Sequence, residues 1–460
     1  MGGYADSGRN RYERFWEQLA VIADRLGTEL AVEPRGAAPG SGVAPWYIHE
    51  AGQLYCRDEP AERLARDHLG GRCGAADPDG CPEDGRLLAV AGDVHLPTEV
   101  DRLNRLAAEP AGDRPKRPGR GPVVSLNHLV SVAINPVTIC PADEPKPVPP
   151  RTGSWPPPAE HGGAGVHVLV IDTGLPVDHP WVGDRTVDVP NQQWQPLHQD
   201  GSGLIRQYAG HGTFVTGVLK SAAPEAKVTM SGALVNGGAQ LEAALGAELL
   251  AVLSELDPWP DIISLSAGGT SQHGRDLLGL EPFLDRLAGH PGTLLVAAAG
   301  NDGSRDNPFY PAARAAGHPG VISVGALRRD GRGRACFSNH GPTVSVFAPG
   351  EEHVNRFPSG LYAYQHPRET ACRYHRPALY PDCPCLGDPG YGTVVSFAGW
   401  ARWSGSSYAT PLVAGMIARH MSDHRMDARA AARDLLARAG ERLADVDGEI
   451  LPVLRPAGLG

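Results

Sequence analysis

From residue 164 onward, short apolar runs alternate with stretches of helical periodicity. The apolar runs are typical of buried strands and cover 166–171, 226–230, 262–265, 293–298 and 321–324. Helical spacing marks 239–256, 276–289 and 407–421. Because parallel strands need a long crossover, usually a helix, the alternation predicts an α/β fold with a mostly parallel sheet and helices on both faces. Ligands of such sheets bind beyond the carboxyl ends of the strands, so functional residues are expected there.

The part of the chain before residue 143 has a different pattern. Its predicted elements are a helix, a strand, a second helix and an extended run, over 10–26, 87–91, 97–106 and 123–134. A chain of 460 residues exceeds what a single hydrophobic core usually organises. We therefore predict a small α+β N-terminal domain over 1–142. Both a removable prodomain and a regulatory module fit this pattern.

A proline-rich stretch separates the two parts. Seven prolines fall between Pro145 and Pro158, and such a segment favours extended polyproline structure over a sheet interior. We place a linker at 143–163 and a second, larger domain at 164–455. Within that domain, 351–400 is long, irregular in pattern and rich in Pro, Tyr and Cys, which predicts an insertion beside the functional site.

Charge and hydropathy exclude several classes of partner. The chain has 42 Lys+Arg against 52 Asp+Glu, a net charge of −10, and its basic residues do not gather into a patch that could follow phosphates. We expect no nucleic-acid partner. No apolar run reaches the roughly 18 residues of a membrane-spanning helix, so no membrane partner is expected either. The first residues lack a secretory signal, which predicts a cytoplasmic protein unless the start is mis-assigned.

The eight cysteines are diluted over the whole chain, so reduced thiols are expected rather than a disulfide framework. Cys372, His375, Cys383 and Cys385 have side chains that can bind metals, but their spacing fits none of the usual zinc patterns. We predict no metal and no cofactor.

Three short motifs contain the residues of a hydroxyl-nucleophile mechanism. Asp172 follows an apolar strand and precedes Thr173-Gly174; His211 stands between two glycines; Ser407 opens an apolar helical stretch. Each has an ordinary alternative, namely a turn-capping Asp, a structural His and a helix N-cap Ser. A nucleophile nevertheless needs a base, a group that orients the base, and donors for the oxyanion, and the chain supplies candidates for all of them.

Together these motifs resemble the signature blocks of the subtilisin-like serine proteases. The order Asp, His, Ser is that of subtilisin and differs from chymotrypsin and the α/β-hydrolases. Two further blocks are similar, Ser266-Ala267-Gly268 after one strand and Ala299-Gly300-Asn301 after another. The resemblance covers about 164–440. It departs from the family pattern at Ser406, Tyr408 and Phe214, and Trp181 stands where a calcium-ligating Asp is common.

The resemblance implies a catalytic role for four residues, with His211 as base, Asp172 as its orienting group, Ser407 as nucleophile and Asn301 as oxyanion donor. It also implies that Ser266, Ala267, Gly268, Ala299 and Gly300 line the pocket for the residue before the cleaved bond. We predict a serine endopeptidase that acts on protein or peptide substrates through an acyl-enzyme, with an N-terminal module that contacts the peptidase domain. Two alternatives stay open: a peptide ligase, macrocyclase or leader peptidase on the same fold, and an inactive binding scaffold.

Overall fold

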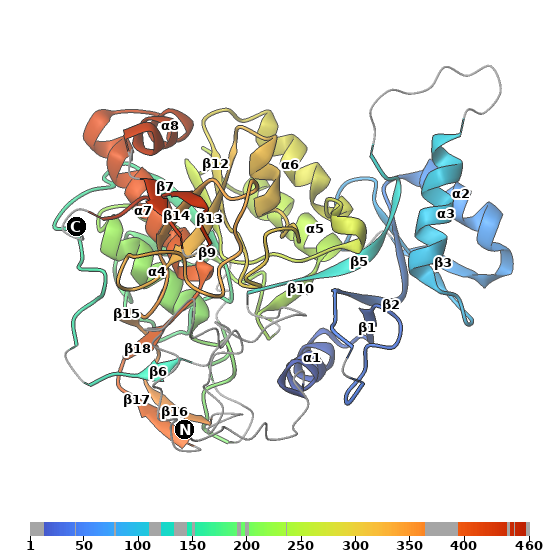
Figure 1. The fold of residues 1–460 in the computed structure, drawn as a ribbon, viewed down its shortest axis with the longest axis horizontal. Helices are drawn as coiled ribbons and strands as arrows, with labels where there is room; N and C mark the ends of the chain where they lie inside the picture. The colour runs from blue at the N-terminus through green and yellow to red at the C-terminus, as the bar shows by residue number, and fades with distance from the viewer. Residues whose placement is uncertain are drawn as a thin grey trace.

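The computed structural model describes residues 13–41, 43–77, 80–109, 121–132, 145–149, 152–190, 195–197, 202–235, 237–363, 394–438, 442–445 and 447–456. Two bodies of unequal size lie side by side, and the smaller one contains the N-terminal elements (Figure 1). Among the described helices, none has the length and apolarity needed to cross a bilayer.

The larger body is built on a seven-stranded sheet in the order β14-β13-β12-β11-β7-β9-β8. Every pairing in it is parallel. Its strands are β7 (His167–Ile171), β8 (Val187–Asp188), β9 (Lys227–Ser231), β11 (Ile262–Leu265), β12 (Leu294–Ala298), β13 (Val321–Leu327) and β14 (Val346–Pro349). The fold-class prediction of a mostly parallel sheet is confirmed.

Helices cover both faces of this sheet. They are α4 (His211–Ala222), α5 (Glu242–Ser254), α6 (Glu281–Ala288), α7 (Ser406–His424) and α8 (Ala428–Arg438). The alternation of side chains along β7 shows the division: Val168 and Val170 pack in the cluster with α4, α7 and α8, whereas Leu169 and Ile171 pack with α5 and α6. Burial on both faces explains why these strands are continuous apolar runs.

The N-terminal body is an antiparallel sheet with helices. Its elements are α1 (Glu13–Leu26), β1 (Leu30–Glu33), β2 (Tyr47–Cys56), α2 (Glu59–Leu69), β3 (Cys73–Asp77), β4 (Arg86–Val90), α3 (Leu96–Ala108) and β5 (Val124–Ser131). The predicted helices and strands are present within a few residues of their expected ends. The sequence analysis did not predict β1, β2, α2 and β3, because their apolar patterns are shorter or more mixed in polarity.

Strand β5 joins the two bodies. It pairs with β2 on one side and with β10 (Ala239–Leu241) of the larger body on the other, so one sheet runs β10-β5-β2-β4-β3 across the boundary (Figure 1). The predicted helix over 239–256 is therefore wrong at its start. Residues 239–241 form a strand because they pair with a segment more than 100 positions earlier, a contact that local periodicity cannot reveal.

The 351–400 region contains more regular structure than its sequence predicted. Strands β15 (His353–Arg356) and β18 (Trp400–Trp403) pair antiparallel, and so do β16 (Gly360–Ala363) and β17 (Val394–Phe397). The expectation of an irregular stretch is thus wrong at both described ends; residues 364–393 lie outside the described part. The linker contributes β6 (Lys146–Pro147) to the edge of β18, where a proline is tolerated. A hairpin of β19 (Arg442–Ala444) and β20 (Ile450–Pro452) follows α8.

Candidate active site

Asp172 and His211 meet at the carboxyl end of the parallel sheet. Asp172 is the first residue after β7, and His211 is the first residue of α4. Nδ1 of His211 lies 2.8 Å from Oδ1 and 3.0 Å from Oδ2 of Asp172, and both side chains are buried. The backbone N–H of Thr173 also donates to Oδ1, at 2.7 Å. The carboxylate thus holds the ring so that Nε2 is turned away from Asp172.

The glycines beside His211 permit close backbone packing. A Cβ on Gly212 would lie 2.4 Å from the carbonyl oxygen of Gly174, and one on Gly210 would lie 2.0 Å from the ring of Phe357. The Gly212 N–H donates to the Thr173 hydroxyl at 3.0 Å. Gly212 therefore lets the start of α4 lie against the turn after β7, and Gly210 leaves room for the ring of Phe357.

An aromatic wall encloses the imidazole. The rings of Trp403 and Tyr408 lie 5.4 Å and 5.5 Å from the ring of His211. Burial, together with the charge of Asp172, raises the pKa of the Tyr408 phenol well above its usual value, so this hydroxyl stays neutral. Tyr408, noted in the sequence as a departure from the family pattern, thus forms part of the wall beside the base.

Ser407 lies in the first turn of α7. Its carbonyl accepts a hydrogen bond of 2.7 Å from the hydroxyl of Ser266, and its own Oγ donates to the carbonyl of Ser266 at 3.3 Å and to that of Val132 at 3.5 Å. Within the described part of the chain, this hydroxyl bonds to the two carbonyls and not to His211. Catalytic hydrogen bonds of this kind often tighten only in the substrate complex.

Asn301 lies beside the nucleophile, with its amide orientation set by Ser406. Its Oδ1 accepts from the backbone N–H of Ser406 at 2.9 Å and from the Ser406 hydroxyl at 2.7 Å. The donor end, Nδ2, is consequently turned away from Ser406. This orientation suits an oxyanion donor, the role that the resemblance implied for Asn301.

The predicted pocket segments leave adjacent strands of the sheet. Ser266, Ala267 and Gly268 follow β11, whereas Ala299 and Gly300 follow β12, and these two strands pair in parallel. Both segments therefore emerge from the same edge, next to Ser407. The structure places the predicted catalytic and pocket residues at this edge of the sheet, and their catalytic and binding roles stay predictions.

The chain's own extended segment lies in front of Ser407, in the space between Gly268 and Gly238 that is called the groove below. Ser131 exchanges backbone hydrogen bonds with Gly268 at 2.9 Å and 3.1 Å, and the N–H of Val132 donates to the carbonyl of Gly238 at 2.9 Å. An extended segment thus lies between two peptidase-domain segments, with the Val132 carbonyl at the nucleophile. The sequence analysis recognised the apolar run at 123–134 but took it as part of the N-terminal fold alone.

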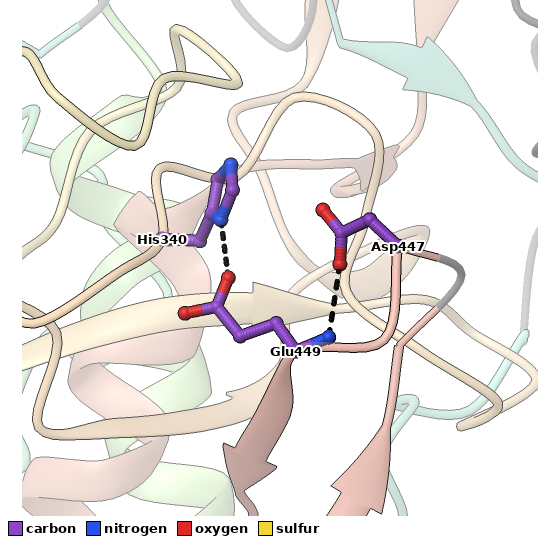
Figure 2. A group of neighbouring side chains, drawn as sticks. All are labelled: His340, Asp447 and Glu449. Atoms are coloured by element: carbon purple, nitrogen blue, oxygen red, sulfur yellow. Dashed lines mark hydrogen bonds and ion pairs between the residues drawn. The ribbon is translucent and has the colours of Figure 1, made fainter.

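One cluster outside this site offers ligand types for a metal. His340, Asp447 and Glu449 place ligand atoms within 4.8 Å of one another (Figure 2). Arginines already neutralise the two carboxylates, since Arg334 pairs with Asp447 at 2.7 Å and Arg305 with Glu449 at 3.0 Å. We therefore interpret the cluster as an ion-pair network. The cluster of Cys372, His375, Cys383 and Cys385 lies outside the described residues.

The fold and the arrangement of Asp172, His211 and Ser407 define the class of protein, a serine peptidase on an α/β sheet. Residues 163–449 match the family-level sequence model described as Subtilase family. The chain belongs to the subtilase family, and its enzyme class is serine-type endopeptidase, as the sequence predicted.

Two curated relatives each match 44% of this chain. Thermitase of Thermoactinomyces vulgaris is 28% identical over 211 residues, 44% of this chain and 68% of thermitase. The intracellular serine protease of Paenibacillus polymyxa is 32% identical over 218 residues, 44% of this chain and 61% of that protein. Among solved structures, a mutant form of the protease domain of PatA is 22% identical with a TM-score of 0.47, covering 64% of this chain and 93% of that one.

Proposed function

We propose that this protein hydrolyses peptide bonds through Asp172, His211 and Ser407, and that its N-terminal module blocks the site until it is cut. The observation that carries the proposal is the peptide segment in the groove, whose Val132 carbonyl oxygen lies 3.5 Å from Oγ of Ser407. An extended chain paired on both sides, with a carbonyl next to a nucleophile, is the geometry expected of a bound peptide substrate.

The chemistry follows from the positions of these groups. Nε2 of His211 takes the proton of Ser407 as Oγ attacks the carbonyl carbon, and Asp172 stabilises the resulting imidazolium. The amide of Asn301 and the backbone N–H of Ser407 donate to the oxyanion. The imidazolium then protonates the leaving amine, and water hydrolyses the acyl-enzyme. No observation favours transfer to an amine over water, and the presence of all four groups argues against an inactive scaffold.

Apolar side chains support the inhibitory role of β5. Val130 and Val132 are buried and belong to the same hydrophobic cluster as Leu245 and Leu265 of the peptidase domain. Leu129 faces the opposite side and packs with Phe15 of α1. The strand is therefore fixed from both bodies, as an inhibitory segment in a substrate groove needs to be.

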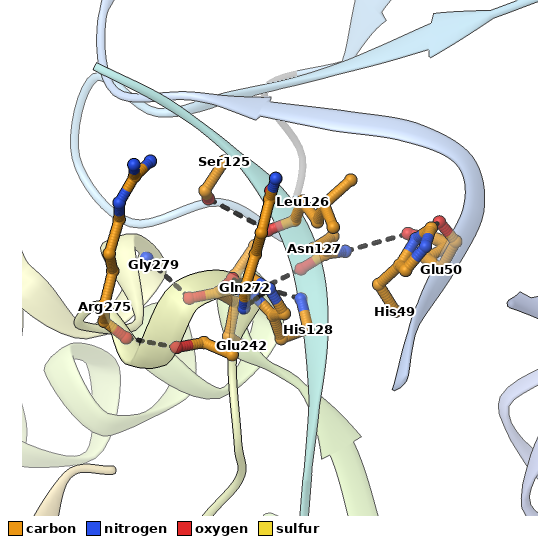
Figure 3. A network of polar contacts seen from close by, with 12 residues as sticks. His49, Glu50, Ser125, Leu126, Asn127, His128, Glu242, Gln272, Arg275 and Gly279 are labelled. Atoms are coloured by element: carbon orange, nitrogen blue, oxygen red, sulfur yellow. Dashed lines mark hydrogen bonds and ion pairs between the residues drawn. The ribbon is translucent and has the colours of Figure 1, made fainter. Parts of the chain in front are cut away.

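A buried polar network supports the same docking (Figure 3). Glu242, at the start of α5, accepts from Nδ1 of His128 at 2.7 Å, from the His128 backbone N–H at 3.0 Å and from the N–H of Gly279 at 3.1 Å. Nε2 of His128 accepts from the N–H of Gln272 at 3.2 Å, which indicates a neutral ring with its proton on Nδ1. A buried carboxylate with three donors is satisfied only while β5 stays in place, because two of the three come from that strand.

Expression of the full chain as wild type and as Ser407→Ala tests the proposal. We expect the wild-type chain to be cut at one of the first peptide bonds after Val132 and then to cleave added peptides, whereas Ser407→Ala stays full length and inactive. Intact mass and N-terminal sequencing measure the cut, and a fluorophosphonate probe measures the reactivity of Ser407. Two full-length proteins with equal, negligible probe labelling would refute the proposal.

A further inference from the structure

A side chain that the mechanism does not use fills the space between the two pocket segments. A Cβ built on Gly268 would lie 2.3 Å from Cε1 of Phe309, and one built on Gly300 would lie 2.8 Å from Cγ of the same ring. Only 8% of Phe309 is exposed. The ring therefore touches both segments at once, and the two glycines are what give it room.

The backbone holds Phe309 in this position. Its neighbour Tyr310 exchanges two hydrogen bonds of 2.9 Å with Gly269, in an antiparallel bridge to the same pocket segment. The Tyr310 hydroxyl donates to the carbonyl of Gly274 at 2.9 Å. The ring cannot leave the pocket by a backbone shift without breaking these bonds, so it acts as a fixed floor.

We propose that Phe309 makes this pocket shallow and restricts the residue before the cleaved bond to a side chain no larger than valine. The inference rests on the proposed function. Protein interiors are close-packed, so a phenyl ring between the two segments excludes another large side chain from the same space. A pocket that is already filled rejects a larger substrate group through overlap.

The side chains of the segment in the groove are small enough for a shallow pocket. Ser131 pairs with Gly268, and the sequence continues with Val132 and Ala133. Whichever of these residues precedes the bond that is cut, its side chain is no larger than valine. The peptide that the enzyme holds in its own groove is thus one that a shallow pocket accepts.

Peptide anilides that differ only in the last residue, as Ala, Leu, Phe or Lys, test the inference with the active wild-type enzyme. We expect kcat/KM to be on the order of 100-fold higher for Ala than for Phe. The series Phe309→Leu, Phe309→Ala and Phe309→Gly enlarges the pocket in steps, and the largest accepted residue should grow with it. Phe309→Gly should raise kcat/KM for the Phe substrate at least about tenfold.

Phe283→Leu is the matched control, because it changes a buried phenyl ring of α6, outside both pocket segments, and should leave the substrate ranking unchanged. A wild-type enzyme that cleaves Phe or Leu substrates as well as Ala, dependent on Ser407, would overturn the inference and leave the proposed function intact. A preference for the Lys substrate would also overturn the inference, because it would indicate that the buried Asp302 selects the substrate. If no substrate is cleaved in a Ser407-dependent way, both proposals fail. If Phe309→Gly does not fold, the ranking of the four substrates by the wild-type enzyme still tests the inference.

Discussion

At the scale of single residues, the carboxylate of Asp172 has a defined set of partners. It accepts from the Thr173 N–H and from Nδ1 of His211. Its burial at 0% exposure strengthens both hydrogen bonds, since water does not compete for the oxygens. Asp172 therefore selects the tautomer of His211 in which Nε2 is the free base.

Asp172→Asn tests this role. The amide keeps the shape of the side chain but can present a donor to Nδ1, which favours the wrong tautomer. We expect kcat to fall by about 10⁴-fold, as in serine proteases with the equivalent change, with little effect on the stability of the fold. Single-turnover kinetics with an activated ester, together with thermal unfolding, measure the two quantities. A loss below about tenfold would contradict the assignment of Asp172.

At the scale of elements, β5 belongs to two units at once. All eight of its residues, Val124 to Ser131, are buried, which is unusual for a strand that links two bodies. It completes the N-terminal sheet through β2 and extends it into the peptidase domain through β10. Release of the groove therefore requires separation of β5 from β10 and from Gly268.

Val130→Asp in a Ser407→Ala background tests the docking of β5. A carboxylate at this fully buried position costs several kcal/mol, so the strand should leave the groove. A fluorescent peptide, followed by anisotropy, should then bind at least tenfold tighter than to Ser407→Ala alone. Val43→Asp, at an exposed valine of the same module, is the control and should change nothing. Equal binding by all three proteins would show that β5 does not occupy the groove.

At the scale of the whole molecule, buried ionisable groups couple global stability to pH. Burial raises the pKa of Asp302 to about 7 and that of Glu351 to about 7, and it lowers the pKa of His353 to about 4. For the two acids the contribution to stability is present at low pH and is lost as pH rises through about 7. For His353 it is present above its unfolded pKa and is lost as pH falls through about 4. The contributions of the two acids and of His353 change in opposite directions with pH, so a variant of one group is needed to separate them.

Asp302→Asn isolates one of these contributions. Because the native carboxyl binds its proton more tightly than the unfolded one, ionisation between pH 5 and 8 destabilises the wild-type protein but not the variant. Relative to the parent, the variant should gain about 2 to 3 kcal/mol over that interval. Urea unfolding in a Ser407→Ala background measures the difference, and Asp306→Asn, at an exposed site, is the control. A difference that stays constant with pH would show that Asp302 is ionised throughout.

The α/β architecture and the catalytic motifs could be predicted from local sequence. Buried parallel strands are continuous apolar runs, so their positions follow from composition over a few residues. Asp172, His211 and Ser407 each lie directly at the end of a strand or the start of a helix, where short motifs identify them. The topology then brings these ends to one edge of the sheet, which makes the grouping of the site predictable as well.

Two features depended on contacts between distant segments and had no local signal. Ala239–Leu241 form a strand because β5 lies beside them, and Val132 reaches Ser407 because that pairing continues to Gly238. Phe309 precedes Tyr310-Pro311 in an irregular segment, and only the approach of Gly268 and Gly300 makes it the floor of a pocket. The sequence determined which residues could perform the chemistry. Tertiary packing decided what lies in the groove and how large a side chain the pocket admits, because both depend on close contacts between surfaces far apart in the chain.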